Sequence, residues 1–84
     1  MKEYVLTFYT KENCPLCEKA KAVIEELSEE FPLKMIEKDI YKDDQLLELY
    51  QLMIPVLELN GEQIGYGLIR KDEVRSELTR LISH

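Results

Sequence analysis

The chain has 84 residues, of which 45% are hydrophobic and 33% are charged. This length suits one small domain, residues 1–84, and the composition argues against intrinsic disorder. The net charge of -6 disfavours nucleic acids and anionic membranes as partners, because both would repel the protein.

The N-terminal stretch MKEYVLTFYT contains a lysine and only a short apolar run. A secretory signal has a longer apolar region and a small-residue cleavage site, so none is predicted here. No apolar stretch of the sequence is long enough for a transmembrane helix. We therefore expect a cytoplasmic protein, in a compartment that keeps thiols reduced and in which a static disulfide is unusual.

The first two predicted elements are a strand and a helix. Residues 4–9 are mostly apolar, aromatic or β-branched, which predicts a strand buried on both faces. After a polar loop at residues 10–13, Pro15 suits the first turn of a helix, and Pro32 is expected to mark its end. The apolar residues of this helix recur at helical spacing: Cys17, Ala20, Ile24, Leu27 and Phe31.

The next two predicted elements are again a strand and a helix. A strand is predicted at residues 34–40, and its charged side chains favour a position at the edge of the sheet. A short helix follows from about Asp43, with Asp43 or Asp44 near its N-cap and with Leu46, Leu47 and Tyr50 facing inward.

The last part of the chain predicts a hairpin and a helix. Strands at residues 56–59 and 62–66 flank Asn60-Gly61, and Asn-Gly favours a tight hairpin because both turn residues take positive φ. The last helix is predicted from its apolar residues, which are Val74, Leu78, Leu81 and Ile82. The order β-α-β-α-β-β-α predicts an α/β fold, with a mixed four-stranded sheet and helices packed on its faces.

Both cysteines of the chain lie in the segment Cys14-Pro15-Leu16-Cys17, where the first strand leads into the first helix. A thiol attacks a disulfide only as the thiolate. The N–H groups of the first helical turn, including those of Leu16 and Cys17, and the helix dipole favour a negative sulfur on Cys14. Lys11 adds positive charge nearby. The sequence therefore predicts that Cys14 is a nucleophile.

Helical periodicity separates the roles of the two thiols. Cys17 lies on the apolar stripe, so we expect it to be buried, whereas Cys14 precedes the stripe and is expected at the surface. The exposed Cys14 would attack a substrate, and Cys17 would resolve the mixed disulfide by closing an intramolecular bond. Two sulfurs on either side of one helical turn can reach disulfide distance with little backbone movement.

Pairs of cysteines with this spacing also occur in zinc and iron–sulfur sites. A tetrahedral zinc site needs about four ligands, and His84, expected in a frayed tail, is the one histidine that the chain offers. A self-contained zinc site is therefore not expected. An iron–sulfur cluster would need a dimer or added ligands, because two cysteines cannot supply four thiolates. Two core cysteines without a redox role remain a further alternative.

The dipeptide Ile54-Pro55 stands directly before the third predicted strand. Proline cannot donate a ladder hydrogen bond, but it is tolerated at the start of a strand. We predict a cis peptide bond at this position, and the backbone of Ile54 would then pair with an extended substrate as an added strand does. A simple strand-start proline in the trans state is the alternative.

These motifs resemble those of the glutaredoxins, in the thioredoxin-like superfamily. The resemblance covers nearly the whole chain, through FYTKENCPLCEKAK, IPVLELNGEQIGYG and the closing helix. It implies a three-layer thioredoxin-like fold of the glutaredoxin type, and a thiol-disulfide oxidoreductase with Cys14 as nucleophile and Cys17 as resolving thiol. It also implies that Pro15 belongs to the catalytic motif, that Pro55 is the cis-proline beside the cysteines, and that Lys11 lies near the carboxylate of glutathione.

The chain departs from the glutaredoxin pattern in its substrate-binding residues. Leu16 replaces the usual tyrosine, and Met53-Ile54 replaces threonine-valine before the cis-proline. The stretch Gly65-Tyr66-Gly67 replaces the Gly-Gly that helps to hold glutathione. Tyr66 would either narrow the glutathione groove or pack on the sheet, and we favour packing because tyrosine is common in strands. The residues expected to line the substrate site are Lys11, Leu16, Met53, Ile54, Gly65, Tyr66 and Gly67.

The predicted function is dithiol-disulfide exchange on disulfide-bearing proteins or small thiols. No tightly bound cofactor or metal is expected. Glutathione as a co-substrate, or a flavoprotein reductase, would supply the electrons, and the protein is expected to be a monomer. The alternatives on the same fold are a dimer that binds an iron–sulfur cluster and an adaptor that exchanges no thiols.

Overall fold

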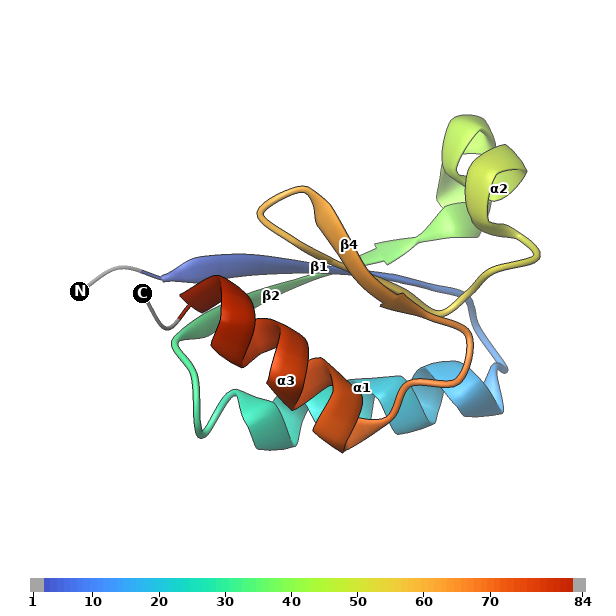
Figure 1. The fold of residues 1–84 in the computed structure, drawn as a ribbon. Coiled ribbons are helices and arrows are strands. Elements are labelled where there is room, and N and C mark those ends of the chain that lie inside the picture. The colour runs from blue at the N-terminus through green and yellow to red at the C-terminus, as the bar shows by residue number, and fades with distance from the viewer. Residues whose placement is uncertain (1–2, 83–84) are drawn as a thin grey trace.

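The computed structural model describes residues 3–82, so His84 lies outside the described residues. Its helices and strands follow the predicted order, with one short 3-10 helix added (Figure 1). Along the chain they are β1 (Tyr4–Thr10), α1 (Pro15–Leu27), β2 (Leu33–Asp39), η1 (Ile40–Lys42), α2 (Asp44–Tyr50), β3 (Val56–Leu59), β4 (Glu62–Tyr66) and α3 (Lys71–Ile82).

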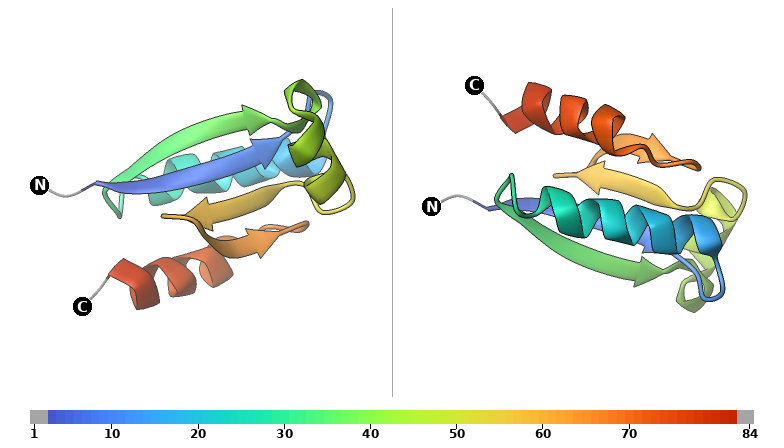
Figure 2. Two further views of the ribbon diagram at one scale, coloured as in Figure 1. Left: turned by 90° about the horizontal axis from the view of Figure 1, so that it is seen from above. Right: turned by 90° about the horizontal axis from the view of Figure 1, so that it is seen from below.

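The strands form one mixed sheet in the order β2-β1-β3-β4 (Figure 2). β1 pairs parallel with β2 and antiparallel with β3, and β3 pairs antiparallel with β4. The prediction that the second strand lies at the edge of the sheet is confirmed. Its parallel pairing with β1 follows from the helical crossover, which returns the chain to the starting end of the sheet.

Helices cover the two faces of the sheet unequally, which gives three layers (Figure 1). α1 and α3 lie on one face, and the short α2 lies on the other, near the end at which β1 finishes. The main core is formed where the sheet meets α1 and α3: Leu6, Phe8, Cys14, Cys17, Ala20, Ile24, Leu27, Leu57, Leu59, Ile69, Val74 and Leu78. A smaller cluster of Tyr9, Ile40 and Val56 packs under α2.

The expectation that the first strand is buried on both faces is right only for its last part. Residues 8–10 are buried, whereas Val5 and Thr7 are only half-buried. α2 has seven residues, and the apolar cluster beneath it includes Tyr9 but neither Val5 nor Thr7. The part of β1 that is covered on both faces therefore leads directly into the Cys14 loop.

α1 ends at Leu27, four residues before the predicted apolar limit at Phe31. The backbone N–H and the hydroxyl of Ser28 both donate to the Ile24 carbonyl, at 2.9 and 2.8 Å, and Ser28 caps the helix. Phe31 lies outside the helix but still packs against the main core. Among residues 3–82, no helix is both long enough and apolar enough to cross a membrane.

The second strand was predicted at residues 34–40, but β2 begins and ends one residue earlier. Ile40 begins η1 instead of ending the strand. The Asp39 carboxylate accepts a hydrogen bond from the Tyr41 N–H at 2.9 Å and so caps this turn. Asp43 caps α2 in the same way, by accepting from the N–H groups of Gln45 and Leu46. The prediction that Asp43 begins a short helix is confirmed.

The predicted hairpin is confirmed at both strands and at its turn. Asn60 and Gly61 take φ values of 50° and 89°, as a tight two-residue turn requires. Asn60 also exchanges two hydrogen bonds with Val5, through its side chain and its backbone N–H. The hairpin is therefore tied to β1, which holds β3 beside the strand that leads to the cysteines.

Candidate active site

The loop between β1 and α1 places Cys14 at the start of the helix. Asn13 has a φ of 54°, a left-handed conformation that asparagine adopts more readily than most residues. Cys14 is extended, with φ -120° and ψ 103°, and Pro15 is the first helical residue, where no N–H is needed. The sequence Asn-Cys-Pro therefore turns the chain sharply and makes Cys14 the N-cap of α1.

The Cys14 sulfur faces the first turn of the helix. The Cys17 N–H donates to Cys14 Sγ at 3.2 Å, and the Glu18 N–H donates to the Cys14 carbonyl at 3.0 Å. The predicted interaction between the Cys14 sulfur and the Cys17 amide is confirmed. A sulfur in this position gains from the donor N–H and from the positive end of the helix dipole when it becomes negative.

The prediction that Cys14 lies at the surface is wrong. The exposed fraction of Cys14 is 8%, close to the 3% of Cys17, and both belong to the main core. Cys14 belongs to the same buried cluster as Ile69, Ile54 packs against that cluster, and both isoleucines are far from Cys14 in the sequence. The periodicity of one helix could not predict that Cys14 is buried together with residues from distant segments.

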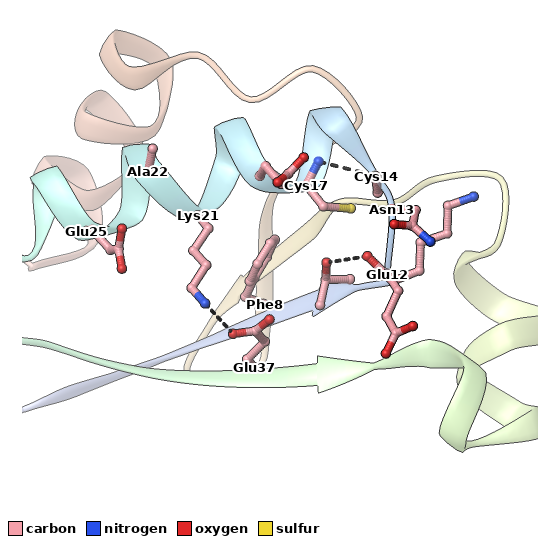
Figure 3. A pocket seen from close by; sticks show the side chains of 12 residues that line it. Phe8, Glu12, Asn13, Cys14, Cys17, Lys21, Ala22, Glu25 and Glu37 are labelled. Carbon is pink, nitrogen blue, oxygen red and sulfur yellow. Dashed lines mark hydrogen bonds and ion pairs between the residues drawn. The ribbon is translucent and has the colours of Figure 1, made fainter.

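Both cysteines nevertheless line an open cavity of about 430 Å³ (Figure 3). Lys11 borders this cavity from the loop, so one predicted substrate-binding residue lies next to the thiols. An ion pair of 3.2 Å between Lys21 Nζ and Glu37 Oε1 connects α1 with the edge strand β2 at the cavity. The cavity gives a small reactant a polar approach to two sulfurs that are otherwise covered.

The Cys17 thiol is held in its protonated form. Burial raises the pKa of Cys17, and its interaction with the Cys14 side chain raises that pKa further. The Thr10 hydroxyl and the Lys11 backbone act in the opposite direction, but the net direction is upward. A protonated Cys17 beside the N-cap sulfur is suited to act second, after Cys14 has reacted.

The second half of the site is built around Pro55. The Ile54-Pro55 peptide bond is cis, as predicted. The Gly67 N–H donates to the carbonyls of Met53 and Pro55, at 3.0 and 2.8 Å. Gly67 has a φ of 71°, which glycine adopts without the cost that a side chain would add. The predicted substrate residues around Met53 and around Gly67 are therefore brought together.

Four exposed apolar residues lie next in sequence to the residues of this site, and we call them the apolar rim: Leu16, Leu52, Tyr66 and Leu68. Leu16 follows Pro15 in the first turn of α1, and Leu52 precedes Met53. Tyr66 and Leu68 flank Gly67, whose N–H is bonded to the Pro55 loop. Exposed apolar groups that gather at one place on a protein commonly mark a binding surface.

The expectation that Tyr66 packs on the sheet is wrong, because 57% of its surface is exposed. Tyr66 ends the edge strand β4 and lies opposite Val56, so the two side chains share the face that carries α2. Val56 belongs to the cluster under α2, but Tyr66 does not pack against that cluster. The short α2 therefore leaves the Tyr66 side chain in solvent.

The backbone of Ile54 is only partly available for pairing with a substrate. The Ile54 N–H donates to the Tyr50 carbonyl at 3.0 Å, so it is already used within the protein. For the Ile54 carbonyl we find no hydrogen-bond donor in residues 3–82. Of the Ile54 backbone groups that were expected to pair with an extended substrate, the carbonyl remains available in this arrangement.

Sequence reasoning missed a polar cluster on the face of the sheet covered by α2. The Glu58 carboxylate accepts one hydrogen bond at each oxygen, from Tyr9 Oη and Tyr50 Oη, both at 3.0 Å. The two tyrosine rings lie 4.7 Å apart between centroids. The signal in the sequence was an acidic residue within the apolar strand VLEL, since such a residue needs polar partners.

This cluster predicts a dependence of folding stability on alkaline pH. Burial, and then the hydrogen bond to Glu58 and the charge of Glu58, raise the pKa of Tyr9 from 10.0 to about 12. A raised pKa means that the contribution of protonated Tyr9 is complete below about pH 10 and is lost as the pH rises through about 12.

The measurement is urea unfolding of the wild type and of Tyr9→Phe at several alkaline pH values. We expect the stability advantage of the wild type to shrink as the pH rises above about 10, because the unfolded chain then ionises Tyr9 first. Tyr50, whose pKa is also raised by burial and by Glu58, is present in both proteins. An advantage that stays constant up to about pH 12 would contradict the assigned hydrogen bond.

Solved structures of other proteins share this fold. A mutant thioredoxin from Halobacterium salinarum NRC-1 is 24% identical, with a TM-score of 0.71, covering 94% of this chain and 74% of that chain. A protein from Nitrosomonas europaea is 25% identical, with a TM-score of 0.72 and coverage of 92% and 93%. A Staphylococcus aureus protein of unknown function is 15% identical, with a TM-score of 0.72 and coverage of 100% and 96%. The fold is thioredoxin-like.

The sequence also matches a protein family, described as Glutaredoxin-like domain (DUF836), over residues 5–79. The resemblance to glutaredoxins inferred from the two motifs is confirmed by this match and by the shared fold. The family match, together with the closeness of Cys14 and Cys17 at the start of α1, indicates a redox-related role. The chain belongs to the Glutaredoxin-like domain (DUF836) family.

Proposed function

We propose that this protein is a thiol-disulfide oxidoreductase that reduces disulfides of polypeptide substrates with its Cys14–Cys17 dithiol. The observation that carries the proposal is the 3.2 Å hydrogen bond from the Cys17 N–H to Cys14 Sγ. It supports Cys14 as the attacking group, because this N–H stabilises a thiolate and stays in place as a helical amide. It also keeps the second cysteine within one helical turn.

The reaction transfers two electrons from the protein to the substrate. The Cys14 thiolate attacks one sulfur of the substrate disulfide, the substrate S–S bond breaks, and the first substrate thiolate leaves and takes up a proton. Cys17 then loses its proton and attacks Cys14 Sγ. The Cys14–Cys17 bond forms, the mixed disulfide breaks, and the second substrate thiolate leaves. The substrate is reduced and the dithiol is oxidised to a disulfide.

The apolar rim supports a polypeptide as the substrate. Its four exposed side chains flank, in the sequence, the Cys14 turn, the Pro55 loop and Gly67, and the Ile54 carbonyl can accept a hydrogen bond from the N–H of an extended chain. A small hydrophilic thiol would leave most of the apolar rim in water. We propose glutathione, entering through the cavity, or a flavoprotein reductase as the donor that returns the dithiol to its reduced state.

The test uses the reduced protein and a synthetic peptide that contains one internal disulfide between apolar residues. We expect one peptide disulfide to be reduced for each protein molecule, with loss of two alkylatable thiols from the protein, measured by mass spectrometry. A protein that keeps both thiols while the peptide stays oxidised would contradict the proposed function. The same peptide with two serines in place of the cysteines is the control for non-covalent binding.

The apolar rim gives a further prediction. Leu52 is 95% exposed, so Leu52→Ser should leave the folded state intact. We expect the rate of exchange with the apolar peptide to fall about fivefold, because part of a leucine side chain is no longer desolvated in the complex. The rate with a small hydrophilic disulfide should not change.

The matched control for this variant is Ile36→Ser, which removes an exposed aliphatic side chain from the edge strand β2. Ile36 does not belong to the apolar rim, and the rates with both substrates should stay within about twofold of the wild type. Equal losses with both substrates in Leu52→Ser would count against a peptide-binding role for the rim.

A further inference from the structure

We propose that Glu58 is a positioning residue that holds the Cys14 loop and the Ile54–Pro55 loop in a fixed relation. Its carboxylate acts through the hydroxyls of Tyr9, which precedes the Cys14 loop in the chain, and Tyr50, which precedes the Ile54–Pro55 loop. The effect on catalysis rests on the proposed function, but the effect on the two loops does not. Glu58 is assigned no contact with substrate or with either sulfur.

The geometry is that of one carboxylate shared by two donors. Glu58 lies in β3, an interior strand of the sheet, and each of its oxygens receives a hydroxyl at 3.0 Å. Tyr9 lies in β1 and Tyr50 is the last residue of α2, so the two tyrosines are far apart in the sequence. Hydrogen bonds to a charged acceptor are stronger than neutral ones, so this cluster fixes both rings.

From Tyr50 the connection continues into the Pro55 loop. The Tyr50 carbonyl accepts hydrogen bonds from the N–H groups of Met53 and Ile54, at 2.8 and 3.0 Å. The carbonyls of Met53 and Pro55 accept in turn from the Gly67 N–H. The orientation of the Tyr50 residue therefore sets the conformation of the segment that presents the Ile54 carbonyl.

From Tyr9 the connection continues to the cysteines. Tyr9 is followed by Thr10, which is buried, and then by Lys11. Thr10 and Lys11 line the same cavity as Cys14 and Cys17, and the Thr10 hydroxyl donates to the Lys11 carbonyl at 3.4 Å. A shift of Tyr9 within β1 would therefore be passed to the loop on which Cys14 is carried.

The choice of a carboxylate at this position is informative. A leucine at Glu58 would continue the apolar pattern of β3 and would need no polar partners. An apolar contact is not directional, whereas a carboxylate with two donors accepts only a narrow range of tyrosine positions. The hydrogen bonds to Glu58 therefore fix the positions of the two tyrosine side chains, whereas apolar packing alone would stabilise the contact without fixing them.

Amide hydrogen exchange tests the positioning role without any redox reaction. The variant Tyr50→Phe removes the hydroxyl and keeps the ring. We expect protection of the Met53 and Ile54 amides to fall about tenfold, while the β1 and β3 amides keep their protection. The matched control is Tyr41→Phe, since no hydrogen bond of the exposed Tyr41 hydroxyl is found in residues 3–82. Unchanged protection of Met53 and Ile54, or an equal loss in all strands, would overturn the proposal.

Replacements of Glu58 provide the second set of variants for the amide hydrogen exchange experiment. Glu58→Gln can accept one hydroxyl and donate to the other, so protection should stay within about threefold of the wild type. Glu58→Leu can do neither. It should lower the protection of the Met53 and Ile54 amides about tenfold, as in Tyr50→Phe, and should also lower amide protection in the Cys14 loop, even where urea unfolding shows no loss of global stability. Equal protection in the Gln and Leu variants would overturn the proposal, because the polar contact would then have no effect.

Kinetics connect the cluster to the reaction. In Tyr50→Phe we expect the KM for the apolar peptide disulfide to rise about fivefold, with the rate of Cys14 alkylation by iodoacetamide unchanged. An unchanged KM would overturn the positioning role in catalysis. If the wild type reduces no disulfide, the proposed function is wrong. The amide hydrogen exchange experiment then still decides whether Glu58 orders the two loops.

Discussion

Replacing Cys14 with serine is expected to abolish disulfide exchange, with a loss of at least about 1000-fold in rate. A serine hydroxyl is not ionised at neutral pH, and an alkoxide does not replace a thiolate in attack on a disulfide. The serine oxygen can still accept the hydrogen bond from the Cys17 N–H, which serine commonly does at the N-cap of a helix. The fold should therefore survive, and the loss should be chemical.

The control for this prediction is Cys17→Ser, which keeps the attacking thiol. We expect this variant to stop after the first step and to accumulate a mixed disulfide, with one peptide attached to Cys14, measured as the summed mass. Mass spectrometry of the proteolytic fragments should locate the attached peptide on Cys14. A Cys14→Ser protein that exchanges disulfides at the wild-type rate would show that another group attacks, and the assigned roles would be wrong.

The largest effect on stability is expected from truncation of the core beneath the site. Leu57 lies in β3 with an exposed fraction of 0% and belongs to the same cluster as both cysteines. We expect Leu57→Ala to lower the free energy of unfolding by about 2–5 kcal/mol, from lost burial and from the cavity left behind. Such a loss is a large part of the total stability of a small domain, which is about 5–15 kcal/mol.

The matched control is Leu49→Ala, which makes the same chemical change on the exposed face of α2. We expect a change within about 0.5 kcal/mol, because this leucine is already largely in water and alanine favours a helix. Urea unfolding, followed by circular dichroism, measures both variants. Similar losses in the two variants would contradict the assigned core.

The sequence was sufficient for most of the fold because the signals were local. Asn60-Gly61 specifies its hairpin through the φ values of two residues, and Asp43 specifies the start of α2 through its own side chain. Apolar runs and helical periodicity placed the remaining elements to within a few residues. The end of α1 was misplaced because the Ser28 hydroxyl, a local polar contact, competes with the apolar periodicity that continues to Phe31.

The sequence was not sufficient for properties that depend on contacts between distant segments. Cys14 is buried in a cluster that contains the distant Ile69 and is flanked by Ile54, and Tyr66 lies outside the cluster under α2. The Glu58 cluster joins β1, β3 and α2, so no spacing in the sequence reveals it. In each case the residue type was visible, but its neighbours were set by the tertiary arrangement.

The central claim is that Cys14 and Cys17 form a reversible redox couple at the start of α1, and equilibration in dithiothreitol buffers of graded potential tests it most directly. Thiols are alkylated after equilibration and counted by mass spectrometry. We predict that both thiols disappear together, in a single two-electron transition, with the linked peptides joining Cys14 to Cys17. Two thiols that stay fully alkylatable across the whole series would contradict the claim.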